Sequence, residues 1–352
     1  MGLRQPGRAR RPPPPARRAA RPHRRAARGP RGRDLLQDGR AGRGRGRAAA
    51  RRRHLRAQPH RRAHRLGARG RSVGDGGLSA TPRPRVVIVG AGFGRLWAAR
   101  SVAKHLGGRD TEVLLVDRNN YHTFFPLLYQ VAAAELAPSD IAYPVRSILR
   151  KTPRVGFRMG EVRRIDLDAR TIEVGEETIG YDRLVLAPGS VAHDCGVPGA
   201  REHAFFLRWM DDAIPLRQQV LARFEAASTE RDAERRRRLL TFVIVGGGPT
   251  GVEFAGALAE FVWGPARRDY VGIGEAEPRI VLLEATDRVL RTMPAHLSKH
   301  AAERLTRRGV DVRTGATVEY IAVTEVQLAG GERIPSETVV WTAGVKGDPR
   351  VA

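Results

Sequence analysis

The chain has 352 residues, a formal net charge of +26 and one cysteine, Cys195. The length allows two domains of roughly 150 residues each, and a single cysteine excludes a disulfide framework or a redox-active dithiol within the chain. The charge alone would suggest a nucleic-acid binder. However, 27 of the 63 basic but only three of the 37 acidic residues lie in residues 1–85, so the other 267 residues carry only +2.

Residues 1–84 form an arginine-rich leader that we expect to be disordered. Residues 1–85 contain no aromatic residue and only eight Leu, Ile, Val or Met, too few to offset the chain entropy of folding. Three interpretations stay open: a tail that binds nucleic acid through phosphate contacts, an organelle transit peptide, and translated GC-rich DNA without an evolved function. The lack of aromatic side chains argues against reading of bases, so a nucleic-acid partner is not expected.

The first predicted elements are a buried strand, Arg85–Val89, a helix over 96–106 and a second strand, Val113–Val116. The second strand ends at Asp117. Glycines follow the first strand at Gly90, Gly92 and Gly94. Strand, glycine turn, helix, strand and acid is the order of a dinucleotide-binding unit. In such a unit the helix N-terminus offers N–H groups to the phosphates and the acid accepts hydrogen bonds from a ribose.

Between the two glycine-rich regions the pattern predicts four accessory parts. Short alternating segments, Val162–Asp166, Thr171–Val174 and Thr178–Ile179, indicate an antiparallel meander packed on the first sheet. Residues 181–190 indicate a buried strand followed by a small-residue loop. Residues 210–227 have helical spacing, and the charged run Glu225–Arg238 is expected to be a solvated linker.

The dinucleotide pattern then recurs. A strand at Phe242–Val245 precedes a complete G-x-G-x-x-G at Gly246, Gly248 and Gly251, a helix over 252–261 and a strand, Ile280–Leu283, ending at Glu284. Thr338–Val345 repeats the strand and small-residue loop of residues 181–190. Two copies in the same context predict two dinucleotide sites, whereas tight turns without a ligand are the alternative. The acid at Glu284 favours NADH over NADPH, although Arg288 could weaken that preference.

Three stretches resemble the type II NADH dehydrogenases, the non-proton-pumping NADH:quinone oxidoreductases of the pyridine nucleotide-disulfide oxidoreductase superfamily. They are Asn119–Gln130 (NNYHTFFPLLYQ), Phe242–Ala259 (FVIVGGGPTGVEFAGALA) and Val340–Lys346 (VWTAGVK). The resemblance implies an α/β fold of two Rossmann-like domains, with an NADH domain inserted in an FAD domain. It also implies electron flow from NADH through FAD to a membrane quinone, in a cytoplasmic enzyme held peripherally on the inner face of the cell membrane, with a homodimer as one possible assembly.

The resemblance assigns roles to individual residues. Glu253 and Gln130 are the implied catalytic residues, close to the nicotinamide, flavin and quinone. For Glu253 the alternative is a carboxylate stabilised by a helix N-terminus, and for residues 126–130 it is ordinary loop packing. The implied cofactor-binding residues are Gly90, Gly92, Gly94, Asp117, Arg118, Pro126, Leu127, Ala187, Gly189, Gly246, Gly248, Pro249, Thr250, Gly251, Glu284, Ala343 and Gly344. No metal ligand is expected.

The sequence departs from the family pattern in three places. Arg95 replaces the third glycine of the first motif, where only a small residue allows close packing, so its side chain should swing outward or push the helix away. Pro188 replaces the threonine of an Ala-Thr-Gly loop and removes a backbone donor. Because the chain stops at Ala352, we expect an incomplete FAD domain and a fragment or frame-disrupted product.

The expected organisation is therefore a leader (1–84), the first part of the FAD domain with a linker (85–238), the NADH domain (239–345) and the start of a return to the FAD domain (346–352). Other flavin reductases with a ferredoxin-type partner are an alternative, whereas disulfide reductases are excluded by the single cysteine. A non-catalytic NADH-binding fragment with a polyanion-binding tail is the alternative from a different class.

Overall fold

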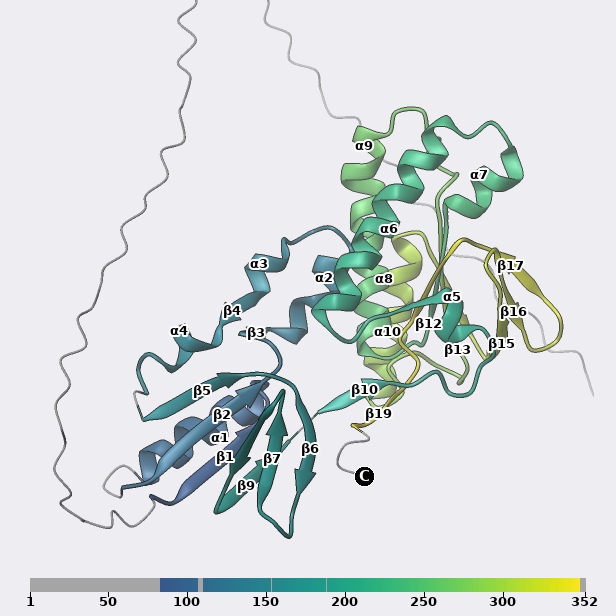
Figure 1. Ribbon diagram of the computed structural model, residues 1–352. Coiled ribbons are helices and arrows are strands. Elements are labelled where there is room, and N and C mark those ends of the chain that lie inside the picture. Colours follow the sequence, from purple (N-terminus) through teal and green to yellow (C-terminus); the bar gives the residue numbers. More distant parts are fainter. Residues whose placement is uncertain (1–82, 107–109, 153, 188, 349–352) are drawn as a thin grey trace, which may run out of the picture. The chain divides into compact units, whose positions relative to one another are not determined.

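The computed structural model describes residues 83–106, 110–152, 154–187 and 189–348 (Figure 1). The expectations for the leader, for Pro188 and for the last four residues lie outside this range. The described residues all belong to one compact body. Within it, the first unit and the second unit each contain one parallel sheet.

The first sheet has four parallel strands in the order β5-β2-β1-β9. They are β1 (Arg85–Val89), β2 (Glu112–Asp117), β5 (Val155–Met159) and β9 (Arg183–Leu186), and α1 (Phe93–His105) connects β1 to β2. Side chains alternate between the two faces. Ile88 and Leu115 pack with Leu96 of α1, whereas Val87 and Val116 pack on the other face against β7.

That other face carries the antiparallel meander of β6 (Val162–Asp166), β7 (Thr171–Val174) and β8 (Glu177–Gly180). Its buried side chains, Ile172 and Val174 among them, form a cluster with Val87 and Val116. The predicted meander on the first sheet is therefore confirmed.

The second sheet has five parallel strands in the order β11-β18-β12-β13-β14. They are β11 (Ala204–Phe206), β12 (Thr241–Val245), β13 (Arg279–Glu284), β14 (Val310–Thr314) and β18 (Thr338–Trp341). The helices α6 (Met210–Thr229), α8 (Pro249–Phe261) and α10 (Ala295–Arg307) pack in one hydrophobic cluster with one face of this sheet. On the other face lie α5 (Ala200–His203) and a second meander, β15 (Val318–Ile321), β16 (Glu325–Leu328) and β17 (Arg333–Pro335). Parallel sheet, covering helices and meander thus occur twice, which confirms the predicted α/β fold with two Rossmann-like units.

A short segment of the first unit packs on the second. It contains β3 (Tyr121–Thr123), η1 (Phe125–Leu127), α2 (Leu128–Ala132), α3 (Pro138–Ile141), β4 (Ala142–Pro144) and α4 (Val145–Leu149). The buried side chains of α2 belong to the same hydrophobic cluster as α6 and α8. By contrast, Val145 and Leu149 of α4 pack with the first sheet.

The chain crosses between the two sheets in a two-stranded antiparallel ribbon, β10 (Ser190–Ala192) with β19 (Val345–Gly347). The N–H of His193 donates to the carbonyl of Gly344 (3.0 Å) and extends this pairing. Arg208 also donates to the hydroxyl of Ser190 through Nη2 (2.7 Å), so the first strand of the ribbon is anchored to the residues that precede α6.

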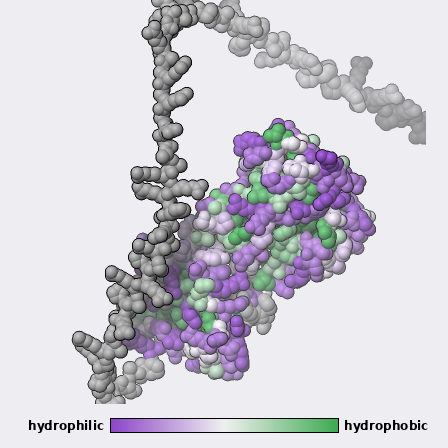
Figure 2. All heavy atoms as spheres, turned by 45° about the horizontal axis from the view of Figure 1, so that its top comes forward, coloured by the Kyte–Doolittle hydropathy of each residue, from purple (hydrophilic) through white to green (hydrophobic). Residues whose placement is uncertain are grey.

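The charged run 225–238 is mostly exposed, as expected from its composition, but it is largely helical and not a linker. It contains the end of α6 and α7 (Ala233–Leu239). Asp232 caps α7 by accepting from the N–H groups of Glu234 and Arg235, and Arg236 pairs with Glu277 (2.5 Å), which fixes the run against a loop that follows η2 (Val262–Ala266) and α9 (Arg267–Asp269). Figure 2 shows that hydrophilic side chains dominate the face drawn there, with apolar ones scattered among them.

Candidate dinucleotide-binding sites

Each glycine motif forms the same backbone turn after the first strand of its unit. Gly90 and Gly246 have φ of +101° and +110°, the left-handed range that glycine adopts without steric cost. Gly92 and Gly248 are the N-caps of α1 and α8, with φ/ψ of −72°/177° and −71°/179°. The cap residues offer no side chain to the first turn of either helix, and N–H groups there are the ones that bind phosphate in dinucleotide sites.

Each turn is held by the acid at the end of the neighbouring strand. Asp117 accepts the N–H of Ala91 through Oδ2 (2.5 Å), and Glu284 accepts the N–H of Gly247 through Oε2 (2.7 Å). The second carboxylate oxygens accept the N–H groups of Asn119 (2.7 Å) and Thr286 (2.9 Å). Both carboxylates are therefore fixed at the mouth of a turn, where they can accept hydrogen bonds from a ribose.

The third position of the motif differs between the turns. A Cβ on Gly251 would overlap the carbonyl oxygen of Gly246 and lie 2.7 Å from the hydroxyl of Thr342, so α8 can approach the turn this closely only with glycine there. Arg95 occupies the equivalent place in the first turn. The expectation that its side chain swings outward was wrong: the guanidinium folds back over the turn, next to Gly90 and Gly92.

The loop after β18 closes the second turn. Gly246 packs against the backbone of Thr342 and Ala343, since a Cβ on Gly246 would lie 2.7 Å from the Ala343 nitrogen. The hydroxyl of Thr342 donates to the carbonyl of Val245 or Gly246, both at 3.0 Å. A Cβ on Gly344 would lie 2.8 Å from the carbonyl oxygen of His193. Thr342 and Ala343 thus approach the turn closely, whereas Gly344 allows the same loop to approach the segment that follows β10.

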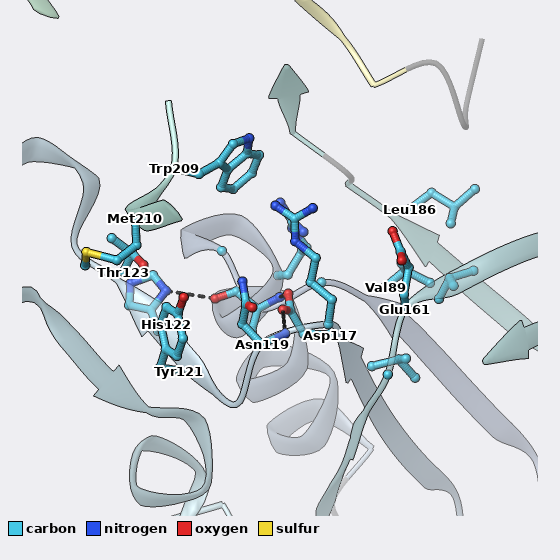
Figure 3. A pocket seen from close by; sticks show the side chains of 18 of the residues that line it. Val89, Asp117, Asn119, Tyr121, His122, Thr123, Glu161, Leu186, Trp209 and Met210 are labelled. Carbon is cyan, nitrogen blue, oxygen red and sulfur yellow. Dashed lines mark hydrogen bonds between the residues drawn. The ribbon is translucent and has the colours of Figure 1, made fainter. Parts of the chain in front are cut away.

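A pocket with an empty volume of about 1160 Å³ opens at the first turn (Figure 3). Its walls come from the turn itself, the end of β2, the strands β3 and β6, and the residues at the start of α6. Predicted cofactor residues in the lining are Gly90, Gly92, Asp117 and Arg118, whereas Gly94, Pro126, Leu127, Ala187 and Gly189 are not among the described residues that line it.

Aromatic and basic side chains shape this pocket. The guanidinium of Arg118 lies over the ring of Trp209, 4.9 Å from its centroid, and Trp209 makes an edge contact with Phe125 (5.3 Å between centroids). His122 is buried and its Nδ1 lies 2.8 Å from the carbonyl of Ala91 in the turn. The sequence pattern pointed to the stretch around His122 but missed Trp209, because the contacts of Trp209 with Arg118 and Phe125 join residues far apart in the chain.

The two implied catalytic residues lie away from this pocket. Gln130 is on α2, where its backbone carbonyl accepts the N–H of Glu135 (2.9 Å). Glu253 is on the first turns of α8, and α2 and α8 are in contact. Partial burial raises the pKa of Glu253. Burial and, after it, the negative charge of Glu253 raise the pKa of Tyr129. The two helices thus bring Gln130, Tyr129 and Glu253 to one region, but not to the first turn.

Neither a metal centre nor a membrane span is found among the residues that the structure describes. No group of three or more His, Cys, Asp or Glu side chains could hold a metal ion. No helix there has both the length and the apolar character needed to cross a bilayer.

Comparison with known proteins supports the interpretation of the two turns. The family model of pyridine nucleotide-disulphide oxidoreductases matches residues 84–352. The chain is 38% identical over 273 residues to the type II NADH:quinone oxidoreductase Ndh of Mycobacterium tuberculosis, covering 75% of this chain and 58% of the relative. It is 33% identical to the mitochondrial external alternative NAD(P)H-ubiquinone oxidoreductase B2 of Arabidopsis thaliana, covering 79% of this chain and 49% of the relative.

A solved structure has the same fold. NDH2 from Plasmodium falciparum, determined in complex with NADH, matches with a TM-score of 0.69 and 22% sequence identity, covering 75% of this chain and 55% of that one. The chain therefore spans between half and three fifths of the length of these relatives. With its duplicated turns, paired acids and matched motifs, the chain belongs to the pyridine nucleotide-disulphide oxidoreductase family.

Proposed function

We propose that the chain is an FAD-dependent NADH:quinone oxidoreductase that passes electrons from NADH through the flavin to a membrane quinone without pumping protons. FAD belongs at the first glycine turn and NADH at the second. The observation that carries the proposal is the repeated hydrogen bond from a turn to its acid: the N–H of Ala91 donates to Asp117, and the N–H of Gly247 donates to Glu284. The names of the relatives, which are type II NADH:quinone and NAD(P)H-ubiquinone oxidoreductases, support the choice of substrates.

The first turn suits FAD by its chemistry. The N-terminus of α1 faces the pocket with a glycine N-cap, Asp117 is held ready to accept ribose hydroxyls, and the Arg118–Trp209 pair offers a flat cationic and aromatic surface. Aromatic and guanidinium planes stack well on a heterocyclic base. FAD, when bound, would supply the transfer of two electrons from NADH to the quinone, and these residues would bind and orient it.

The second turn suits NADH. A Cβ on Gly248 would meet no atom within 4 Å, so the backbone of the turn is open to a diphosphate beside Pro249 and Thr250 at the start of α8. The fixed carboxylate of Glu284 favours a free 2′-hydroxyl and repels a 2′-phosphate. Of the other implied residues, Ala343 and Gly344 provide the close approach of the loop after β18.

Quinone reduction consumes protons, and the α2–α8 region provides a group that can hold one. Burial raises the pKa of the Glu253 carboxyl, so a larger fraction of it is protonated near neutral pH than for an exposed glutamate. We propose that Glu253 holds a proton for the quinone and that Gln130, which lies nearby, orients the quinone ring. The family resemblance is the support for these two roles, and also for peripheral membrane association and a homodimer.

Spectra and titrations of the purified full chain would test the proposal. Bound flavin should give an absorbance band that anaerobic NADH bleaches and a short-chain quinone restores, with NADPH less effective. Arg100 is an exposed residue on α1 that does not line the first pocket. The Arg100→Gln variant is therefore a control, and its flavin absorbance band should be unchanged. Binding of NADH without any bound flavin would instead favour a non-catalytic NADH-binding protein.

A further inference from the structure

Arg95 introduces a fixed positive charge at a place where the second turn has none. In the second unit, Gly251 lets α8 pack on the turn, and Gly246 touches the backbone of Thr342 and Ala343 directly. In the first unit the corresponding space beside Gly90 contains the guanidinium of Arg95. The side chain thus takes the position that a loop backbone occupies in the other half of the repeat.

The guanidinium spans the two backbone segments that should enclose a diphosphate. A Cβ on Gly92, the N-cap of α1, would lie 3.1 Å from Nη2 of Arg95, and a Cβ on Gly189, in the loop after β9, would lie 3.2 Å from the same atom. Arg95 also lines the pocket that contains Asp117 and Arg118. The guanidinium therefore lies on the pocket side of the turn.

The surroundings favour attraction of an anion over simple obstruction. The backbone of the first turn has the same geometry as the second, including a glycine N-cap at the start of the helix. The backbone N–H groups that bind a phosphate are therefore in place. The atoms that crowd the turn belong to the end of a long, flexible side chain, which can shift without moving the backbone. A guanidinium displaced by a small movement would remain within reach of a diphosphate and can bind two of its oxygens.

We propose that Arg95 binds the diphosphate of the dinucleotide in the first site. The third glycine of the motif would allow close helix packing at this position, whereas Arg95 makes a charge-assisted hydrogen bond to the ligand. The inference rests on the proposed FAD site, and it goes beyond that site by assigning the departure from the motif a binding role. Because the contact is between opposite charges near the surface, salt should weaken it.

The test measures binding, not turnover. Quenching of flavin fluorescence gives the FAD affinity of the apoprotein. Competition by ADP, with the second site saturated by NAD⁺, which does not reduce the flavin, reports binding of the diphosphate and adenosine without the flavin ring. Arg95→Gln removes the charge at similar size, Arg95→Lys keeps it, and Arg95→Gly restores the three-glycine pattern. Arg100→Gln on the same helix is the control, and thermal unfolding confirms that each variant is folded.

We expect Arg95→Gln and Arg95→Gly to lower the affinity for both FAD and ADP about tenfold or more at low salt. At high salt the difference from the wild-type chain should be smaller. Arg95→Lys should recover part of the lost affinity. NADH binding at the second turn should not change in any variant. Equal or tighter binding in Arg95→Gly or Arg95→Gln would overturn the proposal and identify Arg95 as an obstruction. If neither the wild-type chain nor any variant bound either probe, both this inference and the proposed FAD site would be contradicted. Arg95-dependent binding without electron transfer to quinone would retain this inference and contradict the proposed function.

Discussion

Replacing Gly251 by alanine tests whether the close packing of α8 on the second turn is as tight as the geometry requires. The new methyl group would overlap the carbonyl oxygen of Gly246 and lie 2.7 Å from the Thr342 hydroxyl. A carbon and an oxygen need about 3.3 Å, so Thr342 alone would have to retreat by roughly 0.6 Å. Its two hydrogen-bond distances to Val245 and Gly246, both 3.0 Å, would then approach about 3.6 Å, where such a bond no longer counts.

The free-energy change follows from these contacts. Overpacking costs about 1–3 kcal/mol and the lost hydroxyl bond about 1 kcal/mol, whereas alanine in place of glycine within the helix regains about 0.5–1 kcal/mol. The Gly251→Ala variant should therefore lose about 1–3 kcal/mol of stability, which lowers the melting temperature by roughly 2–4 °C per kcal/mol. Its NADH affinity should also fall, because the N-terminus of α8 moves away from the diphosphate.

Gly248→Ala is the matched control in the same turn. Its φ of −71° suits any residue and its Cβ would meet nothing within 4 Å, so the loss of stability should stay below about 1 kcal/mol, the cost of alanine at an N-cap. NADH affinity should nevertheless drop, since the methyl group occupies the space reserved for the diphosphate. Differential scanning calorimetry and NADH fluorescence titration measure the two effects. Wild-type stability in Gly251→Ala, or full NADH affinity in Gly248→Ala, would refute the reasoning.

Three further predictions concern other polar groups. Glu284→Gln should raise the ratio of NADPH to NADH affinity about tenfold, because the repelling charge is lost while one acceptor for the Gly247 N–H remains; fluorescence titration of both nucleotides checks it, and an unchanged ratio would contradict the assigned role. His122→Phe leaves the Ala91 carbonyl without its imidazole partner and should cost about 1–3 kcal/mol, measured by urea unfolding, where an unshifted midpoint would be evidence against the contact. Burial raises the pKa of Asp212, so unfolding free energy should fall as pH rises from the ordinary aspartate pKa through the raised one; Asp212→Asn should flatten that dependence, and parallel curves for both proteins would exclude it.

The repeated strands and glycine turns could be predicted from the sequence because their signals are local. Both parallel sheets depend on short apolar runs, and both turns on glycines that directly follow them. Helix starts were less well predicted: α1 begins at Phe93 and α8 at Pro249, three residues before the expected positions in each case. A glycine N-cap, with proline at the first position of α8, allows a helix to begin inside the motif itself.

Other features depend on partners far away in the chain and had no local signal. β11 belongs to the second sheet because Ala204–Phe206 pairs with β18, and the boundary predicted after residue 238 remains a prediction. The helical part of the charged run contacts a distant segment through the pair of Arg236 with Glu277, and composition does not reveal that partner. The direction of the Arg95 side chain depends on the space left between two loops, which a motif does not describe.

The position of α2 has a consequence for how the protein unfolds. Leu128, Val131 and Ala132 of α2 pack in the same apolar cluster as residues of α6 and α8, and not against the first sheet. Separation of the second unit from α2 would expose that cluster to water. The backbone amides of β12 and of α2 should therefore open together and show a common protection against hydrogen exchange. Loss of α2 from the cluster should then also disturb the second glycine turn, which directly follows β12.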